Sequence, residues 1–305
     1  MSCSTVHIAC SVSREYLLPL AVVLHSLVER LRSGAAAKLY LIHEDIPRET
    51  IDVIGSIVET EGIVPSPEQI AAAPQQGRFR RQAAYPILLP ELLPPGVERV
   101  LFLDVDLLVL DDVTELWETD LEGRVFGAAP DAAVPKCSAG RGVKGWRERG
   151  ISEDASYFNC GVLLIDLPRW REREITPRIH DYLRKTEQVD FLHQEALNAV
   201  AWNDWRPVDR RWNLLASLDG RSYQSPACTE WRNPGIVHFA GRMKPWRGPV
   251  GGPFNEPYQN VLGRVIRKVP GEPTDARDRM LSWYDRHARN VLYPLERALW
   301  KTRLF

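Results

Sequence analysis

Residues 97–109 of this chain read V-E-R-V-L-F-L-D-V-D-L-L-V, a long apolar run with two carboxylates inside it. We interpret this apolar run as a buried strand. An ionised carboxylate in such a strand costs several kcal/mol unless it is paired or coordinated. Asp104 and Asp106, close to the end of the run, therefore predict a compensating cation.

The residues before this run alternate between strand and helix patterns. Apolar residues at 6–10 predict a strand, and residues 16–31 repeat apolar side chains at helical spacing. Residues 38–43 predict a second strand, and residues 47–59 predict a second helix with Pro47 at its first position. This β-α-β-α order predicts an α/β fold with a central, mostly parallel sheet flanked by helices.

The pattern continues, less regularly, on both sides of residues 97–109. Pro86 and Pro90 interrupt residues 79–93 and predict a broken helix. A stretch rich in glycine and proline at 248–257 predicts a loop at the domain edge. Strands are expected at 157–167 and 235–239, and helices at 174–184, 193–201, 258–268 and 276–304.

Composition fits a single elaborated domain with a short tail. With 305 residues and 44% apolar content, the chain can bury a substantial core. We expect one domain over residues 1–256 and a helical C-terminal extension over residues 257–305. The formal charge of -1 gives no overall basic field, so a nucleic-acid partner is not expected.

Two further features bear on the cellular compartment. The five cysteines are odd in number, far apart and without C-x-x-C spacing, which predicts reduced thiols rather than disulfides or a zinc site. The chain shows no basic start followed by an apolar segment, and its apolar runs stop well short of the roughly 20 residues of a spanning helix. We therefore expect a cytoplasmic protein.

The spacing of the two aspartates favours a metal site. Residues two apart on a strand share one face, and the carboxyl ends of parallel strands open onto the crevice where α/β sheets bind ligands. Two carboxylates suit Mg²⁺ or Mn²⁺, and a histidine shifts the preference toward Mn²⁺. His238 is the candidate third ligand. Gly241 and Lys244, which follow it, supply the bare backbone and the ammonium that a diphosphate requires.

Four separated blocks cover most of residues 6–246: 101–110 with its D-x-D, 157–164 (Y-F-N-C-G-V-L-L), 193–198 (H-Q-E-A-L-N) and 238–246 (H-F-A-G-R-M-K-P-W). They resemble the motifs of the retaining sugar transferases of glycosyltransferase family eight, which include bacterial lipooligosaccharide galactosyl- and glucosyltransferases and the glycogenins. The resemblance implies a GT-A fold with a single Rossmann-like nucleotide-binding domain. It also implies transfer of glucose or galactose from a UDP-sugar to a glycan or glycolipid hydroxyl.

The resemblance implies roles for residues around the nucleotide and its diphosphate. The metal, Mn²⁺ or alternatively Mg²⁺, would be held by Asp104, Asp106 and His238 and would act as a Lewis acid on the two phosphates. The phosphates would also contact Gly241 and Lys244. The uracil would meet Ala9 and Ser11, and the ribose would meet the backbone of Val105.

For the transferred sugar, the resemblance implies contacts with Asp131, Asn159, Cys160 and Gln194. Gln194 would lie near the anomeric carbon, and Gln194 and Asp131 are the candidate catalytic groups. Retention usually needs a carboxylate nucleophile beneath that carbon, but a glutamine stands there. The expected mechanism is therefore a same-face displacement in which the departing phosphate oxygen takes the proton of the acceptor hydroxyl.

Two positions depart from the family pattern. The block at 193–198 usually reads D-Q-D at its start, whereas this chain has His193 and Glu195. A neutral imidazole can still hydrogen-bond a sugar hydroxyl, so His193 stays a candidate donor-binding residue. The family commonly has an arginine after Tyr85, where this chain has Pro86. Either change implies altered specificity or weakened activity.

Other interpretations stay open beside this one. A non-catalytic sugar-nucleotide or glycan-binding relative would account for His193 and Pro86. A metal-dependent phosphohydrolase or nucleotidyltransferase would need only the D-x-D, but would leave the other blocks unexplained. In the tail, residues 276–304 carry an apolar stripe flanked by arginines, which predicts either peripheral membrane contact or a helix docked on protein.

Overall fold

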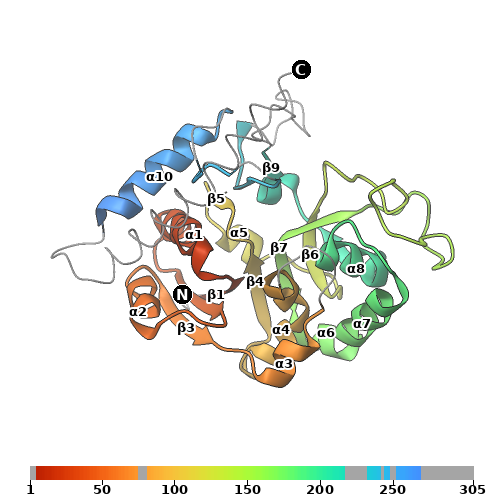
Figure 1. The fold of residues 1–305 in the computed structure, drawn as a ribbon. Helices are drawn as coiled ribbons and strands as arrows, with labels where there is room; N and C mark the ends of the chain where they lie inside the picture. Colours follow the sequence, from red (N-terminus) through yellow and green to blue (C-terminus); the bar gives the residue numbers. More distant parts are fainter. Residues whose placement is uncertain (1–4, 75–80, 217–231, 242–243, 248–251, 269–305) are drawn as a thin grey trace, which may run out of the picture.

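The computed structural model describes residues 5–74, 81–216, 232–241, 244–247 and 252–268 (Figure 1). Its centre is a seven-stranded sheet in the order β3-β2-β1-β4-β7-β6-β8, in which β7 runs antiparallel to its neighbours and the other pairs are parallel. These strands are β1 (Thr5–Ser11), β2 (Ala36–Ile42), β3 (Glu59–Ile63), β4 (Arg99–Leu103), β6 (Phe126–Pro130), β7 (Phe158–Asp166) and β8 (Trp205–Pro207). The predicted α/β fold with a mostly parallel sheet is confirmed.

A second, three-stranded sheet in the order β5-β10-β9 is formed by β5 (Leu107–Val109), β9 (Leu214–Leu215) and β10 (Ile236–His238). The α-helices are α1 (Leu17–Arg30), α2 (Arg48–Gly55), α3 (Pro67–Ala72), α4 (Leu89–Leu92), α5 (Thr114–Trp117), α6 (Leu167–Glu172), α7 (Ile175–Lys185), α8 (Leu192–Ala201) and α10 (Asn255–Lys268). Short 3-10 turns are η1 (Arg14–Tyr16), η2 (Arg81–Leu88) and η3 (Arg210–Asn213).

Alternation along the central strands assigns side chains to the two faces of the large sheet. In β1, Ile8 and Cys10 pack with α1 and α2, whereas Ala9 between them packs on the other face with α4, α7 and α8. In β4, Leu101 faces the first group of helices and Phe102 the second. Helices therefore cover both faces, as the unbroken apolar runs of these strands require (Figure 1).

The expectation of one strand over residues 97–109 is wrong. The run forms β4 and β5, which belong to different sheets, and Asp104, Val105 and Asp106 make the bend between them. β4 pairs with β1 and β7, whereas β5 pairs antiparallel with β10. A continuous strand would have buried both carboxylates between layers of helices at a high desolvation cost. The bend instead holds them at the carboxyl end of β4.

Residues 47–59 also differ from the expectation. Pro47 is the N-cap of α2 rather than its first helical residue, and the helix ends at Gly55. Glu59–Ile63 then forms β3, which the sequence pattern did not predict because E-T-E-G-I has little apolar signal. β3 is the partly exposed edge strand of the sheet, where such polar residues are tolerated.

Among the described residues, the remaining predicted strands and helices are confirmed to within a few residues. The described part of residues 79–93 is a broken helix, with Pro86 inside η2 and α4 directly after it. The other predicted strands and helices correspond to β1, β2, β7, β10, α1, α7, α8 and α10.

The described part of the predicted C-terminal extension is α10, which packs against α1. Tyr258, Val261 and Val265 share an apolar cluster with residues of α1, β5 and β10. The predicted boundary at residue 256 falls within the first turn of this helix. Residues 276–304, with their apolar stripe, lie outside the described residues. Among the helices that are described, none has the length and hydropathy to cross a bilayer.

Candidate metal centre and adjoining polar cluster

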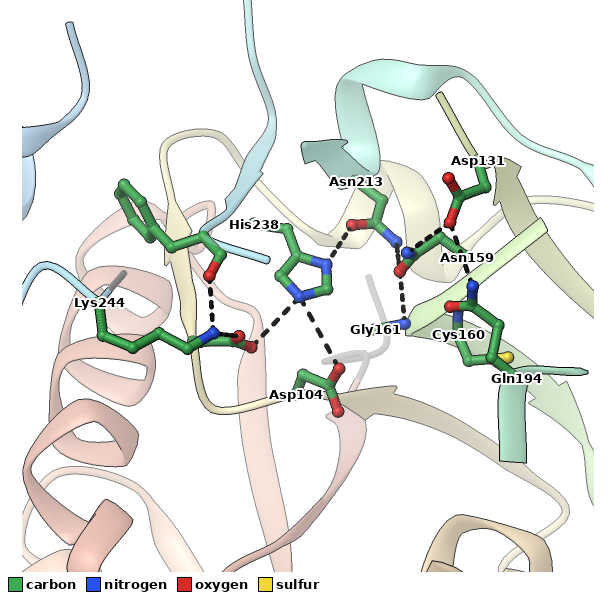
Figure 2. Close-up of polar contacts among 11 residues, drawn as sticks. Asp104, Asp131, Asn159, Cys160, Gly161, Gln194, Asn213, His238 and Lys244 are labelled. Carbon is green, nitrogen blue, oxygen red and sulfur yellow. Dashed lines mark hydrogen bonds and ion pairs between the residues drawn. The ribbon is translucent and has the colours of Figure 1, made fainter. Parts of the chain in front are cut away.

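The three predicted metal ligands come together. Asp104 and Asp106 lie between β4 and β5, and His238 ends β10, more than 130 residues later in the chain. Nε2 of His238 is 3.3 Å from Oδ1 of Asp106 and 3.9 Å from Oδ2 of Asp104. One candidate ligand atom from each of the three residues lies within 4.8 Å of the other two. Figure 2 shows the imidazole of His238 directed at the carboxylate of Asp104.

Backbone hydrogen bonds hold this arrangement from both sides. The Asp104 amide donates to the carbonyl of Gly161 in β7 at 2.8 Å, which ties the bend to the large sheet. The Phe239 amide, just after β10, donates to the carbonyl of Asp106 at 2.9 Å. The antiparallel pairing of β5 with β10 sets His238 opposite Leu107. The candidate ligands are therefore positioned by the pairing of the strands that flank them.

Burial and mutual charge set the protonation of these groups. Burial, aided by the nearby charge of Asp106, raises the pKa of Asp104 to about 7. Burial also opposes ionisation of Asp106, but the charges of Lys244 and His238 outweigh it and hold the pKa of that carboxyl far below its usual range. Burial would lower the pKa of His238, but Asp106 and Asp104 raise it above the usual value. Two oxygen donors and one imidazole nitrogen in this geometry fit a divalent cation.

Lys244 stands beside the three candidate ligands. Its ammonium donates to Oδ2 of Asp106 at 2.5 Å and to the carbonyl of Phe239 at 2.8 Å. Gly241 has a φ of +101°, which favours glycine and lets the chain turn directly after β10. The ammonium is thus held beside the carboxylate pair, on a side chain that is 13% exposed.

A second group of polar residues adjoins the metal ligands and unites three of the residues predicted to meet the sugar. Oδ2 of Asp131 accepts from Nδ2 of Asn159 at 2.9 Å and from Nε2 of Gln194 at 3.2 Å. Oδ1 of Asp131 accepts from the backbone amides of Ala133 and Val134 at 2.7 and 2.9 Å. These three side chains belong to residues that are at most 8% exposed, so the cluster is rigid and nearly fully satisfied.

Cys160 takes part in this cluster through its backbone. Its amide donates to Oε1 of Gln194 at 3.1 Å. Its thiol is free and fully buried, and burial followed by the charges of Asp104 and Asp131 raises the pKa of that thiol well above the usual value. Cys10 and Cys137 are also free thiols, in agreement with the expected reduced state, while Cys3 and Cys228 lie outside the described residues.

Asn213 joins the two groups and was missed in the sequence. It ends η3, is 3% exposed, and stands between His238 and Asn159 (Figure 2). Its Nδ2 donates to Oδ1 of Asn159 at 2.9 Å, and its Oδ1 lies 2.9 Å from Nδ1 of His238. It follows Trp212 in an R-R-W-N stretch outside the four motif blocks, and nothing in that spacing marks it as part of a site.

Gly161 was part of the Y-F-N-C-G block but was not singled out. A Cβ atom on this residue would lie 2.4 Å from Cε1 of His238 and 3.0 Å from Oδ2 of Asp104. Real Cβ atoms do not approach other atoms so closely, so only glycine fits beside these ligands. The signal available in the sequence was the glycine itself, directly after two predicted sugar-contact residues.

The residues predicted to meet the nucleotide lie in the second half of β1 and just after β4. Ser11 is partly exposed at the end of β1, and its hydroxyl donates to the carbonyl of Gln82 at 2.9 Å. Val105 is partly exposed between the two aspartates. Ala9 is completely buried within the apolar cluster of the sheet, and its neighbours Ile8 and Cys10 are completely buried as well.

The two residues in which the block at 193–198 departs from the family pattern have different surroundings. Glu195 is completely buried and accepts hydrogen bonds from the Tyr182 hydroxyl at 2.7 Å and from the Lys144 and Asp190 amides at 3.1 and 2.8 Å. It therefore anchors the residues around 144 and 190. His193 is partly buried, and burial lowers the pKa of its imidazole to about 4, so the ring is neutral near pH 7.

A mostly parallel α/β sheet with a D-x-D motif after a central strand is the arrangement of a GT-A-type glycosyltransferase. The chain belongs to glycosyl transferase family 8, because the sequence model of that family matches residues 7–248. The resemblance drawn from the four motif blocks is thereby confirmed.

Curated proteins with similar sequences include one from a bacterium and one from a plant. General stress protein A of Bacillus subtilis (strain 168) is 26% identical over 288 residues, which cover 88% of this chain and 96% of that protein. Probable galacturonosyltransferase-like 3 of Arabidopsis thaliana is 32% identical over 169 residues, which cover 52% of this chain and 48% of that protein. The match to this plant relative thus spans about half of its length.

Solved structures share the fold. An active-site mutant of LgtC superposes with a TM-score of 0.70 at 21% identity, covering 89% of this chain and 99% of that one. The glycosyltransferase GlyE of Streptococcus pneumoniae TIGR4 gives a TM-score of 0.64 at 21% identity, covering 93% of this chain and 64% of that one. At 21% sequence identity, these similarities show a shared fold and no more.

Proposed function

We propose that the protein is a retaining hexosyltransferase that moves glucose or galactose from a UDP-sugar to a hydroxyl of a glycan or glycolipid. The observation that carries this proposal is the meeting of Asp104, Asp106, His238 and Lys244, from two distant segments, beside the buried cluster of Asp131 and Gln194. One group has the chemistry of a metal-diphosphate site, and the other has hydrogen-bonding groups suited to sugar hydroxyls.

Mn²⁺, with Mg²⁺ as the alternative, is the ion proposed for Asp104, Asp106 and His238. When bound, it would supply Lewis-acid neutralisation of the diphosphate. Lys244 is 2.5 Å from Asp106, so its ammonium can hydrogen-bond a phosphate oxygen beside the ion while keeping its charge near the carboxylates. Gly241, which has no side chain of its own, offers its backbone groups to the phosphates.

The nucleoside is proposed to lie along the ends of β1 and β4. Ser11 carries a hydroxyl at the end of β1, and Val105 is partly exposed between the aspartates. Ala9 would act through the shape of the strand, since its own side chain is buried. The usual location of ligands in open α/β sheets, beyond the carboxyl ends of the strands, agrees with this position.

For the sugar, we propose that Gln194 steadies the anomeric centre and that Asp131 and Cys160 orient it. Asp131 accepts four hydrogen bonds and is 3% exposed, which suits an orienting carboxylate better than a nucleophile. Asn159 and His193 are proposed to contact sugar hydroxyls. The acceptor oxygen forms its bond to the anomeric carbon on the face from which the phosphate leaves, and its proton passes to the departing phosphate oxygen.

The galacturonosyltransferase-like relatives favour a hexuronic acid as a second candidate for the transferred sugar. This alternative keeps the same metal and diphosphate contacts and changes only the group at the sugar's C6. A neutral His193, in the position where the family usually has an acid, would avoid repulsion of a sugar carboxylate.

The test is release of UDP from a panel of UDP-hexoses and UDP-hexuronates with Mn²⁺, comparing the unmodified protein with Asp106→Ala. The exposed Asp154→Ala is the matched control, because Asp154 pairs with Lys136 at the surface and its side chain is 85% exposed. Metal-dependent release from one donor, lost in Asp106→Ala and kept in Asp154→Ala, supports the proposal and identifies the sugar. NMR of the glycoside formed then reports whether the configuration is retained.

The same assay separates the other interpretations. Mn²⁺-dependent UDP binding without release from any donor, in the presence of glycan and glycolipid acceptors, would favour a binding-only relative. Monophosphate or pyrophosphate among the products would favour a phosphohydrolase or nucleotidyltransferase. A covalent sugar trapped on Asp131 would replace the same-face displacement by a double displacement. Action in the cytoplasm is part of the proposal, and so is peripheral membrane contact through residues 276–304. Vesicle sedimentation tests the membrane contact.

A further inference from the structure

The buried side chain of Asn213 makes two specific polar contacts in addition to its packing. It is 3% exposed and comes directly before β9, which pairs in parallel with β10, so its side chain lies beside that of His238. Its amide contacts one candidate metal ligand and one candidate sugar-binding residue, each at 2.9 Å. Both partners are themselves buried, so water does not compete for either hydrogen bond.

Two groups that each have only one hydrogen-bonding role, the Gly161 amide and the Asp131 carboxylate, fix the orientation of the side-chain amides. The Gly161 backbone amide can only donate, and it lies 2.9 Å from one end of the Asn159 side chain, which must be the oxygen. The other end of Asn159 is 2.9 Å from the carboxylate of Asp131, which suits its NH₂ group. Asn159 therefore has one allowed orientation.

The orientation of Asn159 in turn determines the orientation of Asn213 and the tautomer of His238. The oxygen of Asn159 requires a donor, so Asn213 must turn its NH₂ group toward it. The carbonyl oxygen of Asn213 then faces Nδ1 of His238 and requires a proton on that nitrogen. A neutral imidazole with its proton on Nδ1 carries its lone pair on Nε2, the nitrogen directed at Asp104 and Asp106.

We propose that Asn213 is a positioning residue that fixes the metal-binding tautomer of His238. The proposal rests on the metal centre of the proposed function. Partners behind a ligating histidine set its tautomer and ring orientation, and their removal commonly weakens metal binding about 10- to 100-fold. Because Asn213 also orients Asn159, it couples the geometry of the metal site to that of the sugar cluster.

The test is Mn²⁺ affinity of the full-length protein, measured by electron paramagnetic resonance without any donor. Asn213→Ala removes the acceptor for Nδ1 and is expected to raise the Mn²⁺ Kd about 10- to 100-fold. Asn213→Asp keeps an acceptor toward Nδ1 and is expected to weaken Mn²⁺ binding less, although it loses the donor to Asn159. Equal affinity of Asn213→Ala and the unmodified protein would overturn the proposal.

Asn198→Ala is the matched control for loss of a buried asparagine. Asn198 is completely buried and makes three hydrogen bonds to the backbone of Phe158 and Gln194, neither of which is a candidate metal ligand. We expect Asn198→Ala to lower the urea midpoint while leaving the Mn²⁺ Kd near that of the unmodified protein. If it weakens Mn²⁺ binding as much as Asn213→Ala, the role of Asn213 is only structural.

A measurement on the unmodified protein does not depend on how the variants fold. With Mg²⁺ bound, ¹⁵N NMR of labelled histidines, assigned with His238→Gln, should show the His238 proton on Nδ1. A proton on Nε2 would overturn the inference while leaving the metal site intact. Absence of both Mn²⁺ and Mg²⁺ binding in the unmodified protein would overturn the metal centre of the proposed function and this inference together.

Discussion

Gly161 and His238 are in such close contact that a single methyl group on residue 161 would overlap the imidazole. A Cβ atom there would lie 2.4 Å from Cε1 and 2.6 Å from Nδ1 of His238, and 3.0 Å from a carboxylate oxygen of Asp104. The central strand β7 thus touches two candidate metal ligands at the one position without a side chain. Steric fit at this contact, as well as charge, determines whether the ligands can converge.

Gly161→Ala is therefore expected to displace His238 or Asp104. Overpacking of this kind costs roughly 1–3 kcal/mol of stability. We expect the Mn²⁺ Kd, measured by electron paramagnetic resonance, to rise more than the loss of stability alone would explain. Gly55→Ala is the matched control, because a Cβ there meets nothing within 4 Å. Unchanged Mn²⁺ affinity in a folded Gly161→Ala protein would contradict the contact.

Lys244→Met should separate metal binding from nucleotide binding. The ammonium lies 2.5 Å from Asp106, so its removal takes away a competing cation and is expected to leave Mn²⁺ binding equal or tighter. A lost charge-assisted hydrogen bond to phosphate would raise the UDP Kd about 10- to 100-fold. Isothermal titration with Mn²⁺ alone and then with UDP measures both effects. A parallel loss of both affinities would show that Lys244 instead holds the ligands in place.

Glu195→Gln should affect stability more than metal affinity. Each of the three partners of Glu195 donates a hydrogen bond, so an NH₂ group on the side chain must face at least one donor. Leaving one such buried group unsatisfied costs roughly 1–3 kcal/mol, which urea unfolding measures. The Mn²⁺ Kd is expected to stay unchanged. Loss of metal binding without loss of stability would place Glu195 in the metal site after all.

The lowered pKa of His193 predicts that part of the stability of the fold is lost at acid pH. Burial lowers its pKa to about 4 from the usual 6.5, so the unfolded chain binds the proton first as the pH falls. The stability associated with the neutral ring is complete above about pH 6.5 and is lost as the pH falls toward about 4. His193→Asn should flatten this part of the profile of unfolding free energy against pH. Parallel profiles for both proteins would refute the prediction.

The residues that converge could be predicted only in part. Asp104, Asp106, His238 and Lys244 were found because carboxylates inside an apolar run, and a histidine followed by glycine and lysine, are unusual and have a chemical explanation. Asn213 could not be found in this way, because an asparagine in a polar stretch is ordinary until the strand it precedes pairs with β10. The same holds for Glu195, whose buried anchoring role depends on Tyr182 in another helix.

The sequence by itself determined the class of fold and the family, because apolar periodicity and the four motif blocks are local properties of the chain. Tertiary structure alone decided where the long apolar run breaks, since the cost of burying Asp104 and Asp106 depends on which layers would cover them. It also decided that β5 pairs with β10, which brings His238 to the aspartates from the far end of the domain. Pairings between distant segments depend on the whole packed core, and no local pattern encodes them.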